Sequence, residues 1–344
     1  MSPAAPSGYR PPRWLRNAHV QSVLAGSPLR RRRGLAALAA AGAETRQVIV
    51  DGGDGVRLLG LHTARPGVEP QGMALLLHGW EGSADSAYVC LATAGFLARG
   101  WDVFRLNFRD HGGSHHLNPD IFHSARIDEV VHAAVDVARR MPRPRLVVAG
   151  HSLGGNFALR LALRAPAAGL PLEAVAAVCP VLDPARTMAS MEQGLPLYLR
   201  HFERSWRRSL VRKRALFPGH VDVDDRVLRL RMRALTEWLV LRHTDFGSLD
   251  AYFDRYSIAG DRLAGLSVPA SILTSADDPV IPVDDFGRLV LPADALLEVA
   301  PWGGHCGFLE GPRLGGYAER WIVERLAGAR QGRATIGGFR AQRP

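Results

Sequence analysis

Short apolar runs alternate with amphipathic stretches along most of the chain from residue 46 onward. Met73–Leu77 is apolar over its whole length and precedes a His-Gly pair, and Arg145–Ala149 runs into Gly150 in the same way. Runs of this length bounded by turn residues are typical of fully buried strands. Between them, Tyr88–Ala98 has the length and composition of a helix. The pattern therefore predicts βαβ units and a mainly parallel sheet.

Other segments extend this alternation in both directions. The remaining predicted strands are Gln47–Val50 and Val56–His62 (a hairpin), Trp101–Asn107, Ala174–Cys179, Ala270–Thr274 and Ala295–Val299. The remaining predicted helices are 124–140, with Ser124 as its N-terminal cap, and Asn156–Arg164, Phe286–Leu291 and Leu314–Leu326. We predict an α/β fold in which helices flank one central sheet.

The alternation is interrupted over residues 184–260, which are rich in arginine and aromatic residues and mostly helical by pattern. One sheet that carries a helical cap insertion explains this arrangement better than two sequential domains. The predicted parts are an N-terminal segment packed on the core (1–45), the first part of the core (46–183), the cap (184–260), the second part of the core (261–330) and a loose basic tail (331–344).

Charge adds one question to this picture, because the chain carries a net charge of +10 and 42 of its 43 basic residues are arginines. Such a balance can indicate nucleic acid or an anionic membrane as partner. The excess is confined to residues 1–46, 200–233 and 325–344, and the rest of the chain is net acidic. No zinc-finger, RNP-like or basic heptad pattern is present. We therefore do not expect nucleic acid as the main partner. The arginines of the cap either form a solvated face or allow peripheral contact with an anionic membrane.

The three cysteines are far apart in the sequence and include no C-x-x-C pair, which favours a reduced, cytoplasmic setting without a metal site. No apolar run approaches the ~20 residues that span a bilayer. Arg30–Arg33 precede an alanine-rich stretch in a way that resembles a twin-arginine export signal. Trp14, Leu15 and Val20 indicate packed structure instead, so we expect a basic loop followed by a turn or short helix.

Gly150-His151-Ser152-Leu153-Gly154 matches G-x-S-x-G between a predicted strand and a predicted helix. That context is the one a nucleophile elbow requires, because the tight turn strains the backbone at the serine and leaves no room for side chains at the flanking glycines. We predict Ser152 as the nucleophile.

A serine nucleophile needs a base that is itself oriented by an acid, and this kind of fold supplies them in the order Ser, Asp or Glu, His. Asp277 and Asp278 follow one predicted strand, and His305 follows the next within a glycine-rich loop. Both loops come at the carboxyl ends of strands, where α/β sheets place their sites. His305 is the predicted base, and the residues alone leave the acid open between Asp277 and Asp278.

The negative oxygen formed during acyl transfer needs preorganised N–H donors. One should be the backbone N–H of Leu153, directly after the nucleophile. The other should come from the loop 78–82, with Trp80 as the expected donor. The Trp80 side chain either forms a wall of the site or packs against its neighbours without a role in binding.

A histidine-rich loop follows the strand predicted at Trp101–Asn107. Its spacing matches no common zinc site and acyl transfer needs no metal, so we predict none. We expect His111 and His123 to hold the loop by hydrogen bonds, and Arg109 to pair with Asp110. The histidines of this loop are His111, His115, His116 and His123.

These residues resemble the α/β-hydrolase superfamily over roughly residues 45–330, and more closely its YheT-like branch of hydrolases and esterases. The stretches that carry the closer resemblance are 11–22, 78–83, 105–109, 122–124 and 304–308. The resemblance implies that the N-terminal stretch belongs to the fold, and it favours Asp278 as the acid because Asp278 begins an Asp-x-Val-Ile-Pro pattern. Residues 110–116 and His151 depart from the branch, which weakens assignment of a substrate.

The function predicted from the sequence is hydrolysis of a small carboxylic ester through an acyl-enzyme on Ser152, with His305 as base and Asp278 as its partner. The apolar cap favours a lipid-like ester, and no cofactor or metal is expected. The same triad would serve an acyltransferase or a thioesterase. A different class of function is also possible for such a chain, namely a binding scaffold without catalysis. The complete set of triad residues argues against this hypothesis.

Overall fold

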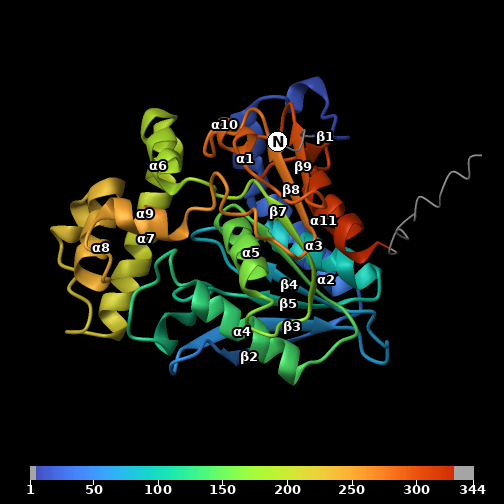
Figure 1. Ribbon diagram of the computed structural model, residues 1–344, viewed down its shortest axis with the longest axis horizontal. Helices are drawn as coiled ribbons and strands as arrows, with labels where there is room; N and C mark the ends of the chain where they lie inside the picture. Colours follow the sequence, from blue (N-terminus) through green and yellow to red (C-terminus); the bar gives the residue numbers. More distant parts are fainter. Residues whose placement is uncertain (1–4, 329–344) are drawn as a thin grey trace, which may run out of the picture.

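The computed structural model describes residues 5–328, which form a nine-stranded sheet with helices on both faces (Figure 1). The strand order is β1-β9-β8-β7-β6-β4-β5-β3-β2. The pairs β2–β3 and β3–β5 are antiparallel and the other pairs are parallel. The predicted mainly parallel α/β sheet is confirmed, and the tail 331–344 lies outside the described residues.

The strands of this sheet are β1 (Ala5–Pro6), β2 (Glu44–Asp51), β3 (Arg57–Ala64), β4 (Met73–Leu77), β5 (Asp102–Leu106), β6 (Leu146–His151), β7 (Leu172–Val178), β8 (Ala270–Ser275) and β9 (Leu296–Ala300). A short hairpin joins β10 (Leu309–Glu310) to β11 (Gly315–Gly316). The helices are α1 (Ala18–Ala25), α2 (Pro28–Ala40), α3 (Ala87–Ala98), α4 (Ile127–Arg140), α5 (Leu153–Arg164), α6 (Pro184–Gln193), α7 (Pro196–Leu216), α8 (Met232–His243), α9 (Leu249–Tyr256), α10 (Asp284–Gly287) and α11 (Tyr317–Ala327).

The central strands are buried on both faces, which is why they appear as continuous apolar runs in the sequence. Along β4, Leu75 and Leu77 pack into the core shared with α4 and α5, whereas Ala74 and Leu76 pack into the core shared with α3 and α11. Successive side chains of a strand point to opposite faces, so one short run supplies both cores. The sheet is thereby fixed between two helical layers, and the carboxyl ends of its parallel strands lie at one edge.

Several predicted helix boundaries were wrong, and at three of them backbone hydrogen bonds to another segment explain the difference. Ser124 does not cap α4, since its N–H donates to the Tyr252 hydroxyl and the helix begins only at Ile127. The helix predicted at Phe286–Leu291 is reduced to α10, because the N–H of Val290 donates to the carbonyl of Gly260. Gly315–Gly316 pair as β11, so α11 begins at Tyr317 rather than at residue 314.

The arginine-rich N-terminal stretch forms the 13-residue helix α2, longer than the turn or short helix expected from its sequence. The helix lies close to α3, where a Cβ on Gly34 would come within 2.8 Å of the Cys90 Cβ. Arg30 is completely buried and pairs with Glu319 of α11 at 2.6 Å. Among residues 5–328, no helix is both long enough and apolar enough to cross a bilayer.

Helices α6–α9 form a cap beside the carboxyl edge of the sheet, at the left of Figure 1. The buried carboxylate of Glu203 organises part of it by pairing with Arg207 and Arg231 and accepting the N–H of Met232. Some of the arginines that made this segment so basic are therefore used in ion pairs within the cap.

Candidate active site

The turn between β6 and α5 holds Ser152 at a positive φ of +54° with ψ −121°. Non-glycine residues rarely adopt this conformation, and it turns the serine side chain away from the sheet. The flanking glycines are required by close contacts: a Cβ on Gly150 would come within 2.0 Å of the Gly154 carbonyl oxygen, and one on Gly154 within 2.4 Å of the Leu77 carbonyl oxygen. The structure thus gives the G-x-S-x-G segment the geometry of a nucleophile elbow.

His305 lies directly beside this serine, on the loop after β9. The Ser152 hydroxyl donates to His305 Nε2 over 2.9 Å, and His305 Nδ1–H donates to Asp278 Oδ2, also over 2.9 Å. The loop can bring the imidazole here because Gly303 and Gly304 adopt φ values of +150° and +54°. A Cβ on Gly304 would also come within 2.2 Å of the Ala18 carbonyl oxygen, so this position has no space for a side chain.

The two adjacent aspartates have different partners. Asp278 contacts the imidazole, its side chain is fully buried, and its Oδ1 also accepts the N–H groups of Val280 and Ile281. Asp277 Oδ1 instead accepts the N–H of Gly304 over 2.9 Å. The structure therefore brings Asp278 to the histidine and leaves Asp277 to hold the backbone of the loop that carries it.

The carboxylate of Asp278 also determines how readily His305 is protonated. Burial lowers the pKa of His305. The charge of Asp278, the neighbouring Cys306 and the hydrogen bond to Asp278 raise it by more than burial lowers it, so the pKa lies well above its usual value. A histidine with a stabilised imidazolium form is suited to accept a proton from a neighbouring hydroxyl.

The loop that carries Trp80 is fixed on both sides of this residue. The N–H of Gly79 donates to the Tyr88 hydroxyl over 2.8 Å, and the N–H of Glu81 donates to His111 Nε2 over 3.2 Å. His111 can accept because its Nδ1–H donates to the Arg109 carbonyl and burial lowers its pKa to about 4. Leu153 is the first residue of α5, where backbone N–H groups have no acceptor within the helix.

The N-terminal segment supports the histidine loop. The N–H of His305 donates to Ser22 Oγ over 2.8 Å, and the N–H of Leu309 donates to Gln21 Oε1 over 2.8 Å. Gln21 is completely buried and in turn donates to the Tyr9 hydroxyl. The sequence indicated that this segment packs on the core, but it did not connect Gln21 or Ser22 with the site. The one available signal was the family resemblance of the stretch 11–22.

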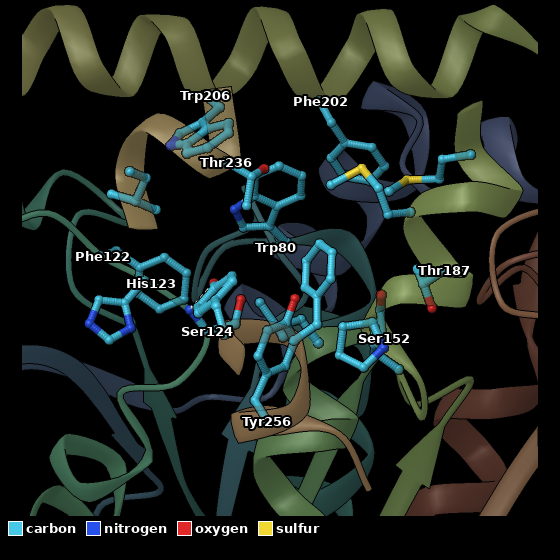
Figure 2. A pocket seen from close by; sticks show the side chains of 18 of the residues that line it. Trp80, Phe122, His123, Ser124, Ser152, Thr187, Phe202, Trp206, Thr236 and Tyr256 are labelled. Carbon is cyan, nitrogen blue, oxygen red and sulfur yellow. Dashed lines mark hydrogen bonds between the residues drawn. The ribbon is translucent and has the colours of Figure 1, made fainter. Parts of the chain in front are cut away.

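A pocket of about 760 Å³, open at its mouth, lies between Ser152 and the cap (Figure 2). Trp80 forms part of its upper wall, where its ring stacks on Phe202 at 5.2 Å between centroids and meets Trp206 edge-on at 5.5 Å. Most other lining side chains are apolar, including Met188, Met191, Leu239, Tyr252, Phe253 and Val280. The site can therefore accept an apolar group next to the serine.

The ion pair predicted between Arg109 and Asp110 was wrong. Arg109 pairs with Glu129 of α4 at 2.7 Å, and Asp110 pairs at 2.6 Å with Lys213, the only lysine of the chain. The cap helix α7 supplies this lysine, so a partner distant in sequence replaces the adjacent one. Burial raises the pKa of Asp110 and lowers that of Lys213, and the charge of each partner opposes that effect on the other.

We expect Lys213→Met to lower the free energy of unfolding by about 3–5 kcal/mol, because it leaves the buried Asp110 carboxylate without a countercharge. Urea unfolding followed by circular dichroism measures this. Arg212→Met, at the exposed neighbouring position, is the control and should change the free energy by less than about 0.5 kcal/mol. Equal effects of the two substitutions would show that the pair does not stabilise the cap.

The chain is similar to a family model and to solved structures of other proteins. A family model described as the alpha/beta hydrolase fold matches residues 75–312, and no curated protein matches the chain. An esterase from Pyrobaculum calidifontis is similar with a TM-score of 0.56 and 17% identity, covering 92% of this chain and 97% of that one.

Two further solved structures are similar in the same way. An esterase from Pyrococcus furiosus has a TM-score of 0.54 and 14% identity, covering 84% of this chain and 94% of its own. A bacterial membrane phospholipase A, described as a virulence factor, has a TM-score of 0.53 and 18% identity, covering 90% and 93%. At these identities the likeness shows a common fold.

Proposed function

The chain belongs to the α/β-hydrolase family, and from this premise we propose that it is a serine hydrolase that cleaves carboxylic esters through an acyl-enzyme on Ser152. The proposal rests on one observation: two consecutive hydrogen bonds connect Asp278 through His305 to the Ser152 hydroxyl. A scaffold that only binds ligands does not need this chain of hydrogen bonds. The YheT-like branch remains our proposal, based on the stretches quoted above.

The proposed reaction has two steps. His305 Nε2 takes the hydroxyl proton of Ser152 while the serine oxygen attacks the ester carbonyl. Asp278 holds the imidazole in the tautomer whose Nε2 can accept this proton. The backbone N–H groups of Trp80 and Leu153 bind the negative oxygen of the intermediate. His305 then protonates the leaving alcohol, and afterwards it activates a water molecule that releases the acid. An alcohol or a thiol in place of this water would make the same site an acyltransferase.

The apolar pocket supports an ester with a hydrocarbon chain as substrate. Its lining is mostly apolar, as in sites that bind small molecules, and each methylene group buried in it contributes about 0.8 kcal/mol. One of the similar structures is described as a membrane phospholipase A, and the arginines of the cap would suit an anionic lipid surface. We propose medium-chain or lipid-like esters as the substrate class.

Labelling with a fluorophosphonate probe tests the proposed nucleophile. The full-length protein should form one adduct, and mass spectrometry should locate it on the peptide that contains Ser152. Hydrolysis of p-nitrophenyl esters of increasing acyl length is measured in parallel. An adduct on another residue, or no turnover of any ester in the series, would contradict the proposal.

The chain-length preference can be tested with two leucines of the same helix. Leu239 of α8 lines the pocket, so Leu239→Trp should exclude two or three methylene groups from it. At about 0.8 kcal/mol each, we expect the octanoate-to-acetate ratio of kcat/KM to fall roughly 15- to 60-fold. Leu241→Trp is the matched control, since Leu241 is 55% exposed on the same helix. If both variants changed the ratio equally, the pocket would not be the site that binds the chain.

A further inference from the structure

Two cysteines lie beside the proposed catalytic histidine, although they are far apart in the sequence. Cys179 follows β7 and Cys306 follows His305, and the potential ligand atoms of these three residues all lie within 4.8 Å of one another. The Cys306 sulfur lies 4.0 Å from His305 Nε2, the nitrogen that faces Ser152. Ester hydrolysis as proposed above uses neither thiol.

The backbone holds both thiols in this place. Cys179 and Cys306 adopt φ values of +44° and +56°, which are uncommon for residues other than glycine and tend to occur at functional positions. The thiol of Cys306 donates to the Val178 carbonyl over 3.7 Å, and that of Cys179 donates to the Gly304 carbonyl over 3.9 Å. The two loops are thus connected through the same residues that bring the sulfur atoms together.

This cluster has the donors that a soft metal ion requires. Thiolate and imidazole groups bind Zn²⁺ at about 2.3 and 2.0–2.1 Å, so neighbouring ligand atoms in a tetrahedral site are about 3.5–3.8 Å apart. The three atoms therefore need to approach by about 1 Å or less. His305 Nδ1–H already donates to Asp278, which is the second-shell arrangement that orients a metal-binding imidazole.

We propose that Cys179, Cys306 and His305 Nε2 form an inhibitory site for a soft metal ion such as Zn²⁺. Both thiols lose their protons to solvent on binding, so two thiolates balance the charge of the ion in a buried place. The ion takes the lone pair of Nε2 that would otherwise accept the proton of Ser152. Turnover therefore stops while the ion is bound. This last consequence rests on the proposed function, whereas the binding site does not.

Binding is measured without reference to activity by titrating the reduced, full-length protein with Co²⁺. We expect one ion per chain and sulfur-to-cobalt charge-transfer absorption that Zn²⁺ displaces. Loss of a second-shell partner alone costs about 10–100-fold in metal affinity, so Cys179→Ala and Cys306→Ala should each weaken binding by at least about 100-fold. The third cysteine provides the matched control, because Cys90 is buried among Leu38 and Leu97 away from the site, and Cys90→Ala should bind normally.

Inhibition is then measured as the ratio of ester turnover with and without Zn²⁺ for each variant, so that differences in basal rate cancel. The wild type and Cys90→Ala should lose at least about 90% of turnover at saturating Zn²⁺, and the other two variants should retain theirs at the same concentration. Absence of the charge-transfer band, or equal affinity in all variants, would overturn the proposed site. A normal cobalt spectrum in a protein without esterase activity would instead support the site and contradict the proposed function.

Discussion

Replacing Ser152 by alanine is expected to reduce kcat/KM for an ester roughly 10⁴- to 10⁶-fold. The hydroxyl oxygen is the atom of this residue that could form the acyl-enzyme, and its loss removes the nucleophile that His305 activates. In the proposed mechanism the residual rate would come from the N–H groups of Trp80 and Leu153, which would still bind the oxyanion. Steady-state hydrolysis of p-nitrophenyl esters measures this loss.

Ser205→Ala is the control, because it makes the same exchange on cap helix α7 at a serine that does not line the pocket. We expect its rate to stay within about twofold of wild type, as a substitution away from the site should. Both variants should unfold near the wild-type temperature, since the Ser152 hydroxyl has its hydrogen bond with the side chain of His305 and not with the backbone. A Ser152→Ala enzyme that kept a tenth of the activity would contradict covalent catalysis at this residue.

The core of the fold could be predicted because its strands are short, buried and bounded by turn residues. β4 has the predicted bounds, Met73–Leu77, since burial on both faces leaves an apolar residue at every position. The hydrophobic pattern predicted helix boundaries less well where a segment forms hydrogen bonds with a distant part of the chain. Ser124 is a residue type that caps helices, but its N–H donates to the hydroxyl of Tyr252 in the cap, and no local pattern could reveal that partner.

The site could be predicted as far as its chemistry requires a local motif. The elbow at Ser152 and the two loops after β8 and β9 are recognisable because each needs glycine, proline or aspartate at fixed positions. Long-range contacts were not predictable. The single lysine, Lys213, gave no sign that it would be buried against Asp110, and the wide spacing of the cysteines suggested that Cys179 and Cys306 were unrelated. Such contacts depend on how the loops and the cap pack, which the sequence pattern does not encode locally.

The largest remaining effect is expected at the acid, where the adjacent aspartates provide a paired experiment. Asp278→Asn should lower kcat about 10⁴-fold. The amide oxygen would keep the hydrogen bonds from the N–H groups of Val280 and Ile281, which turns the amide NH₂ toward His305 Nδ1. Nδ1 must then accept, so Nε2 carries the proton and can no longer take one from Ser152.

Asp277→Asn tests the same chemical change one residue away. Its amide oxygen can still accept the N–H of Gly304, so we expect the loop to keep its shape and kcat to fall less than about tenfold. Measuring kcat for both variants against one ester separates the two roles, because both substitutions remove one negative charge from the same loop. A greater loss in Asp277→Asn would reverse the assignment, since it would mean that the contact between Asp278 and His305 does not determine which nitrogen holds the proton.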